Sequence, residues 1–137
     1  MKKILFSFIT SSIFMSQLSP VIAEEVTVNT LMKTFQSQGA VAGNESRGEK
    51  FWNQTFSGKA PFAQRSCKSC HSSNLKQQGE HVRTHKILKP LAPSVNQASL
   101  SDIKKVNKWF KRNCKWTIGK ECSAQEKADI LAFIKQQ

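Results

Sequence analysis

The stretch CKSCH, residues 67–71, is the strongest indication of fold and chemistry in this chain. Cys67 and Cys70 place two thiols three positions apart, and His71 adds an imidazole directly after the second thiol. In an exported protein, C-x-x-C-H is the sequence at which haem c is attached. The two thiols would form thioethers with the porphyrin, and the histidine would bind the iron from one side. The motif therefore predicts one covalent haem c, with His71 as its proximal ligand.

Two other interpretations of the cysteines fit the sequence less well. A thioredoxin-type dithiol needs a βαβ setting, and the chain has no alternating strand pattern of any length. A tetrahedral zinc site needs two further ligands, and the spacing of Cys114 and Cys122 is wide for that role. In an oxidising compartment, each of the four cysteines is expected to be in a disulfide or otherwise covalently occupied.

Residues 1–23 have the features of a secretory signal peptide. Lys2 and Lys3 precede a mostly apolar run, and residues 21–23 (VIA) offer a small-residue cleavage site. An uncleaved N-terminal anchor is the alternative, although the run is short and interrupted for a membrane span. Loss of the two lysines lowers the net charge from +12 to +10. We expect a basic periplasmic protein that meets acidic protein surfaces or anionic lipid, and no nucleic acid.

The first half of the chain predicts two helices. A helix is expected at 28–38, and a second at 48–56, with the Gly-rich stretch QGAVAGNESRG between them. Residues 72–96 are polar and irregular. Small cytochromes c pack an N-terminal helix across a C-terminal one, and Gly48 with Trp52 would supply one side of that crossing.

The second half predicts two more helices. One is expected to begin at a cap formed by Ser99 or Ser101 and to run to about Cys114. The last opens at Ser123, because SAQE has the form of a capping box in which Glu126 reaches back. Leu131 and Phe133 would supply the other side of the helix crossing.

Together these elements predict an all-α fold with long loops, of the small class I cytochrome c type, with an extra N-terminal helix. The expected organisation is a signal peptide at 1–23, an N-terminal helix and linker at 24–46, and a haem-binding domain at 47–137.

The second axial ligand of the iron does not follow the usual pattern. An ordinary small cytochrome c uses a methionine well downstream of its C-x-x-C-H motif, whereas Met1, Met15 and Met32 all precede the motif. Two of them leave with the signal peptide, and Met32 is expected to pack in the core. His81 and His85, in the charged loop GEHVRTHK, would give bis-His ligation but are expected to be surface residues.

Asn113 is a further candidate ligand. On a helical wheel at about 100° per residue, Ile103, Val106, Trp109 and Phe110 share one face, and Asn113 falls in the middle of it. An amide buried there would cost about 1–3 kcal/mol without a partner. The amide is therefore expected either to bond nearby backbone at the end of the helix or to bind the iron.

The stretch KRNCKWTIGKECSAQEKADILAFI, residues 111–134, with CKSCH and KPLAPS upstream, resembles the SHP-type cytochromes c, the sphaeroides haem protein family. The shared pattern is R-N-C, a short loop, G-x-x-C, and then an E-K-x-D helix opened by Thr or Ser. The resemblance covers about Arg47 to Phe133 and is most specific in its last third.

In that family the asparagine before the third cysteine is the sixth iron ligand through its side-chain oxygen, and the third and fourth cysteines form a disulfide. The resemblance therefore implies that Asn113 is the distal ligand and that Cys114 pairs with Cys122. This chain departs from the pattern at His85, where a glycine is usual. That departure leaves room for a second, histidine-ligated form.

We therefore expect an exported monohaem cytochrome that transfers one electron, and whose ferrous haem binds O₂, NO or CO once Asn113 releases the iron. No general acid or base is evident beside Asn113, so catalysis is not the expected function. The alternatives are a haem enzyme that reduces O₂, peroxide or nitrogen oxides, and a bis-His electron carrier. The resemblance implies a di-haem cytochrome c or a membrane b-type cytochrome as redox partner. The basic residues expected to face such a partner are Lys104, Lys105, Lys108, Lys111, Arg112 and Lys115.

Overall fold

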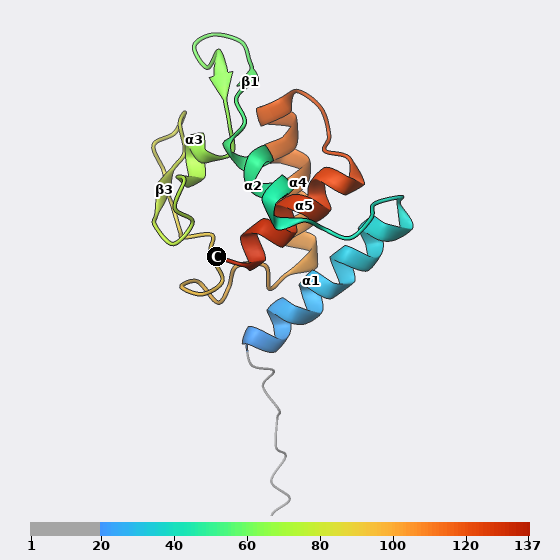
Figure 1. Ribbon diagram of the computed structural model, residues 1–137. Helices are drawn as coiled ribbons and strands as arrows, with labels where there is room; N and C mark the ends of the chain where they lie inside the picture. Colours follow the sequence, from blue (N-terminus) through green and yellow to red (C-terminus); the bar gives the residue numbers. More distant parts are fainter. Residues whose placement is uncertain (1–19) are drawn as a thin grey trace, which may run out of the picture.

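The computed structural model describes residues 20–137, so most of the predicted signal peptide lies outside the described residues. Within this range the all-α prediction is confirmed, with two small β-ribbons in addition (Figure 1). The helices are α1 (Pro20–Ser37), α2 (Glu45–Asn53), α3 (Lys68–His71), α4 (Ile103–Ile118) and α5 (Ala124–Lys135). The antiparallel ribbons pair β1 (Phe56–Ser57) with β2 (Gln64–Arg65), and β3 (Gly79–Glu80) with β4 (Ile87–Leu88). Among residues 20–137 no helix is long and apolar enough to cross a membrane.

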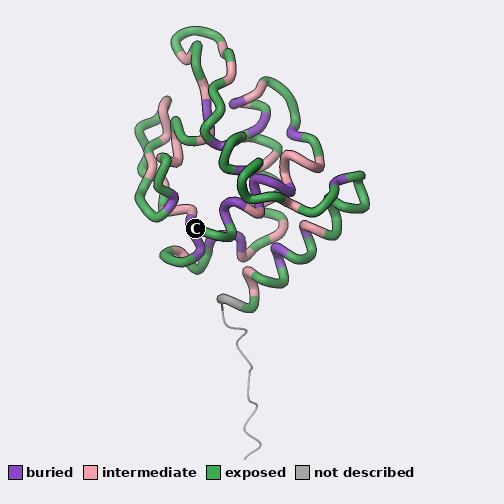
Figure 2. Tube along the Cα trace, viewed as in Figure 1, coloured by how far each residue is buried: buried purple, intermediate pink, exposed green. Residues whose placement is uncertain are grey.

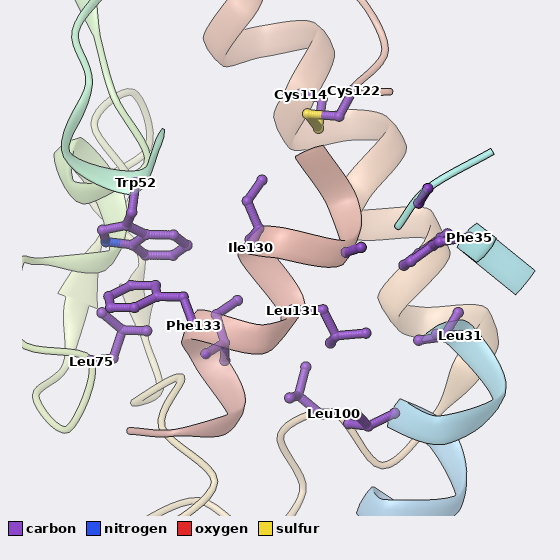
Figure 3. Packing of buried hydrophobic residues seen from close by; sticks show 14 of the residues in the cluster. Leu31, Phe35, Trp52, Leu75, Leu100, Cys114, Cys122, Ile130, Leu131 and Phe133 are labelled. Carbon is purple, nitrogen blue, oxygen red and sulfur yellow. A yellow bond between two sulfur atoms is a disulfide. The ribbon is translucent and has the colours of Figure 1, made fainter. Parts of the chain in front are cut away.

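Helix α5 is the centre of the hydrophobic core. Figure 3 shows Trp52 of α2 with Phe133 on one side of α5, and Leu31 and Phe35 of α1 on the other. Leu131 is completely buried between these layers. Buried residues follow the inner faces of the helices, whereas the loops that carry β3 and β4 are mainly exposed (Figure 2). A helix buried on two sides in this way gains most of its stability from packing, because an isolated helix of this length is marginal in water.

The predicted crossing of an N-terminal and a C-terminal helix is confirmed as the packing of α2 on α5. A Cβ placed on Gly48 would collide with the carbonyl oxygen of Asp129 and lie 2.8 Å from Cβ of Phe133. One turn later, the Trp52 ring packs against Phe133 with a centroid distance of 5.9 Å. The small residue lets the two backbones approach, and the large residue then fills the space where they diverge.

An ion pair fixes the same crossing. The Arg47 guanidinium donates from Nε to Oδ2 of Asp129 and from Nη2 to its Oδ1, each at 2.8 Å. The Asn44 backbone N–H and the Gln125 amide donate to Oδ1 as well, at 2.8 and 2.9 Å. Burial alone would raise the pKa of Asp129, but these hydrogen bonds outweigh it and hold the pKa below its ordinary value.

Helix α2 begins earlier than the predicted start at residue 48. The side-chain oxygen of Asn44 accepts a hydrogen bond from the Arg47 backbone N–H at 2.9 Å and so caps the helix. The helix ends at Asn53, and Phe56 lies in β1 instead of continuing the helix.

Helix α4 differs from its prediction at both ends. Asp102 caps it by accepting from the Lys105 backbone N–H at 3.0 Å, so the predicted caps at Ser99 and Ser101 are wrong. The Ser99 and Ser101 hydroxyls instead donate to carbonyl oxygens of the preceding loop. The helix also continues past Cys114 to Ile118 and stops where Gly119 adopts a left-handed φ of 77°.

Helix α5 begins as predicted. The Ser123 hydroxyl accepts from the Glu126 backbone N–H at 3.2 Å, and the Glu126 carboxylate accepts from the Ser123 N–H at 2.7 Å. This reciprocal capping box is a local interaction, which is why the sequence alone predicts it.

The substitution Gly48→Ala should destabilise the protein. Alanine ordinarily stabilises a helix by about 0.5–1 kcal/mol relative to glycine. Here the added Cβ collides with the α5 backbone, and overpacking of this kind costs about 1–3 kcal/mol. The free energy of unfolding by urea measures the change, with Lys50→Ala on the exposed side of α2 as the matched control. An increase in stability for Gly48→Ala would contradict the close approach of α2 and α5.

The ion pair at Asp129 should make stability depend on acid pH. A carboxylate whose folded pKa lies below its unfolded value contributes stability above the unfolded pKa of about 3.9, and that stability is lost as pH falls through the folded pKa. We expect the unfolding free energy of the wild-type protein to fall below about pH 4. Asp129→Asn should be less stable at pH 7 and should show a flatter decline between pH 5 and pH 2. Parallel curves for the two proteins would remove Asp129 from this role.

Candidate haem-binding site

The C-x-x-C-H motif forms one short turn of helix. Cys67 is the cap of α3, and Cys70 and His71 are its last residues. The Ser66 and Ser69 hydroxyls hydrogen-bond to each other at 2.9 Å and hold the start of the turn. Within the described chain, Cys67 and Cys70 are half-buried free thiols, so neither is engaged in the disulfide found elsewhere.

The burial of Cys67 does not favour a redox-active dithiol. Burial raises the pKa of the Cys67 thiol to about 12. Thioredoxin-type cysteines need the opposite shift, because the thiolate is the reactive species. A thioether bond makes no such demand, since its sulfur carries no charge.

His71 is half-buried and packs beside Trp52. Its ring lies 5.7 Å from the Trp52 ring, centroid to centroid, and the Trp52 indole N–H donates to the Ser72 carbonyl oxygen at 3.2 Å. Burial, and secondarily the nearby His81, keep the pKa of His71 below its ordinary value. A neutral imidazole has a free lone pair, which is the form that binds a metal. Trp52 also packs against Phe133 (Figure 3), so His71 is tied to the core through Trp52.

Gly79 positions the following loop against the motif. A Cβ at this position would collide with the Cys70 carbonyl oxygen and lie 2.9 Å from Cα of His71. The β3–β4 ribbon therefore packs directly on α3. In the sequence, this contact is indicated by nothing more than a glycine in a polar loop.

The surroundings of Asn113 differ from the prediction. Its side chain is exposed and lies inside α4, so the predicted burial of this amide is wrong for the protein chain, as is its predicted position at the helix end. The reason is that Phe110 and Cys114 occupy the core-facing positions, which leaves Asn113 on the flank of the helix. Trp109, 44% exposed, and half-buried Trp116 lie on the same flank, at positions four before and three after Asn113.

A disulfide follows Asn113 directly. It joins Cys114 of α4 to Cys122, just before the cap of α5, with the Cα atoms 5.5 Å apart. This is the pairing that the resemblance implies. Within the loop that it closes, the Lys115 ammonium lies 3.2 Å from the Glu121 carboxylate.

Trp116 connects this part of α4 to the segment before the C-x-x-C-H motif. The Arg65 guanidinium lies 4.9 Å from the centre of the Trp116 ring and donates to the Trp116 carbonyl oxygen at 2.7 Å. Phe62 of the β1–β2 loop adds a ring contact at 6.4 Å. Arg65 is two residues before Cys67, so the flank that carries Asn113 and the turn that carries His71 are joined through one side chain.

His81 would not bind iron in this conformation, because its Nδ1 is already hydrogen-bonded. Its Nδ1 accepts hydrogen bonds from the Arg83 and Thr84 backbone N–H groups, at 3.3 and 3.2 Å. In a neutral imidazole the other nitrogen, Nε2, then carries the proton and offers no lone pair. Ligation by His81 would require this turn to rearrange.

The imidazole of His85 is likewise engaged by another side chain. Its Nδ1 lies 2.5 Å from a Glu80 carboxylate oxygen, and its side chain is 76% exposed. The backbone φ of His85 is +53°, in the left-handed region that glycine adopts most readily. The glycine that the resemblance implies at this position would adopt this conformation readily.

The residues present fit a covalently bound haem. One turn of helix carries two thiols that do not pair with each other and an imidazole packed beside Trp52. A second element, α4, presents an amide oxygen at Asn113 beside an exposed aromatic ring at Trp109. If haem c is bound here, the thiols would form its two thioether bonds, the imidazole would be a strong iron ligand and the amide oxygen a weak one.

Comparison with known proteins supports the same assignment. Residues 38–134 match the family model described as a domain of unknown function, DUF1924. The chain is 32% identical to the cytochrome c-type protein SHP of Cereibacter sphaeroides over 118 residues, which is 86% of this chain and 90% of that protein.

Two solved structures share the fold. The structure of oxidised SHP, described as an oxygen-binding cytochrome c, superposes with a TM-score of 0.73 at 32% identity and covers 80% of this chain and 96% of that one. The solution structure of cytochrome c'' from Methylophilus methylotrophus, described with reference to haem-ligand detachment, gives 0.69 at 31% identity and covers 85% and 95%. The predicted small cytochrome c fold is therefore confirmed, and the chain belongs to the SHP-type cytochromes c.

Proposed function

We propose that this protein is an exported carrier of single electrons whose iron also binds a small ligand when it is reduced. Its cofactor is haem c, which supplies one-electron chemistry and an iron with two axial positions. Cys67 and Cys70 hold the porphyrin through thioether bonds, and His71 is the proximal ligand. The packing of His71 against Trp52, at 5.7 Å between ring centres, fixes the imidazole in one orientation.

Asn113 is the distal ligand in this proposal. Met32, the methionine within the described residues, lies in α1, and its side chain packs against the core near Gly43. His81 and His85 are held by other partners. Asn113 has no such engagement: its side chain is exposed on the flank of α4 that is joined to the haem-attachment segment. This exposed amide, placed immediately before the Cys114–Cys122 disulfide, is the observation that carries the proposal.

The amide oxygen of Asn113 is a hard, neutral donor. Such a donor binds ferric iron better than the softer ferrous ion, which prefers imidazole or π-accepting diatomic molecules. Asn113 is therefore expected to stay bound in the oxidised protein and to leave when the protein is reduced. The relatives agree with this behaviour, since one is described as oxygen-binding and the other in terms of haem-ligand detachment. O₂, NO and CO are the ligands expected to take the vacated position.

The outer face of α4 suits an acidic redox partner. The helix has no acidic residue between Ile103 and Ile118, and complementary charge speeds the encounter of redox proteins. The six basic residues that are exposed on it are Lys104, Lys105, Lys108, Lys111, Arg112 and Lys115. A di-haem cytochrome c or a membrane b-type cytochrome with an acidic docking surface is the partner that we propose. The signal-like N-terminal sequence supports a periplasmic location for electron transfer with this partner.

Asn113→Val should leave the haem attached and abolish the low-spin ferric spectrum, because valine has the approximate size of the side chain but no donor atom. Optical spectra of the purified ferric protein test this, with haem content measured separately. Asn107→Val, an exposed position on the same helix, is the matched control and should keep the wild-type spectrum. An unchanged low-spin spectrum in Asn113→Val would exclude Asn113 as the ligand.

Reduction of the wild-type protein should convert a low-spin ferric form into a high-spin ferrous form that binds CO rapidly. Spectra of the ferric, dithionite-reduced and CO-treated protein measure this directly. Low-spin spectra in both oxidation states without CO binding would indicate a strong sixth ligand, and single substitutions of His81 and His85 by alanine would then identify it. Steady turnover of O₂, peroxide or a nitrogen oxide with a redox partner would instead favour the haem enzyme.

A further inference from the structure

Arg65 is a cation in an unusual position. It is half-buried, yet it forms no ion pair among residues 20–137. Its guanidinium is satisfied by two carbonyl oxygens, that of Trp116 at 2.7 Å from Nη1 and that of Phe62 at 3.0 Å from Nε. A partly desolvated guanidinium bound only by neutral groups is costly to keep, so the position of Arg65 calls for a physical explanation.

The Trp116 carbonyl explains the contact on the side of α4. Trp116 is among the last four residues of the helix, whose carbonyls lack partners within it. A cation at a helix C-terminus is also favoured by the helix dipole. Arg65 therefore caps the end of α4, and the Trp116 ring packs against the guanidinium at 4.9 Å.

The position of Arg65 in the chain gives this cap a consequence at the site. The disulfide and the pair of Lys115 with Glu121 are contacts within the loop that follows α4. Arg65 instead comes from β2, 51 positions away in sequence, and stands two residues before Cys67. Trp116 lies on the same flank of α4 as Asn113, less than one turn further along.

We propose that Arg65 is a positioning residue that holds the C-terminal turn of α4 against the haem-attachment segment and thereby sets how readily Asn113 leaves the iron. This inference rests on the proposed distal ligation by Asn113. Loss of the Arg65 contact would let the end of α4 move relative to the turn that carries His71, and Asn113 would release the iron more often. Electron transfer itself does not require Arg65.

The rate at which imidazole binds the ferric holoprotein tests this, because imidazole can bind only after Asn113 has left. Arg65→Gln should raise that rate by about tenfold, since it removes one charged hydrogen bond and one stacking contact. The imidazole-binding rate of Arg65→Lys should lie between those of the wild type and Arg65→Gln, because lysine keeps the charge but lacks the planar guanidinium. Lys127→Gln is the matched control: the Lys127 ammonium also lies over an aromatic ring, Phe35 at 6.0 Å, but this contact joins α5 to α1. The imidazole-binding rate of this control should stay within about twofold of the wild-type rate.

A double variant separates this inference from the function on which it rests. If imidazole can bind only after Asn113 has left the iron, Arg65→Gln should have no further effect on the imidazole-binding rate in an Asn113→Val background. A wild-type rate for Arg65→Gln, together with an altered ferric spectrum for Asn113→Val, would overturn the role of Arg65 and leave the distal ligand in place. An unchanged spectrum for Asn113→Val would overturn both.

Thermal unfolding and haem content complete the test. A role of Arg65 in stability alone would lower the melting temperature but leave the imidazole rate at 20 °C unchanged, and this result would also overturn the proposal. If Arg65→Gln does not fold, the intermediate rate expected for Arg65→Lys decides the question.

Discussion

The close approach of α2 and α5 at Gly48 is the contact on which the rest of the structure depends. It brings Trp52 between Phe133 on one side and His71 on the other, so the orientation of the proximal imidazole follows from the packing of two helices. The Arg47–Asp129 ion pair secures the same crossing from its polar side. His71, the proposed proximal ligand, is thus connected to the core through Trp52.

The distal half has a different character. Asn113 lies on the flank of an otherwise amphipathic helix, exposed and next to an exposed tryptophan. The core side of that helix is fixed by Phe110 and Cys114, whereas the flank is held by a disulfide loop and by Arg65. In the proposed function, His71 would be the ligand that stays bound and Asn113 the ligand that leaves.

The sequence predicts those parts of the molecule that depend on local interactions. The C-x-x-C-H turn and the capping box of Ser123 with Glu126 are encoded within a few neighbouring residues. The helix crossing at Gly48 joins distant residues and was expected from the packing of small cytochromes c. The environment of Asn113 was predicted incorrectly, because a wheel of apolar residues does not show that Cys114 takes the core position. The contact of Arg65 with Trp116 joins positions that are 51 apart, and neither residue type signals the other.

Helix α1 has its own consequence for where this domain begins. The family model starts at residue 38, after α1 has ended at Ser37. Yet Val28, Leu31 and Phe35 are each at most 2% exposed, and the Phe35 ring meets Phe110 of α4 edge-on at 6.0 Å. A protein cut at residue 38 would present the apolar faces of α4 and α5 to solvent, which favours self-association. The unit that folds is therefore longer than the segment that the family model matches, because α1 covers the side of the core opposite Trp52.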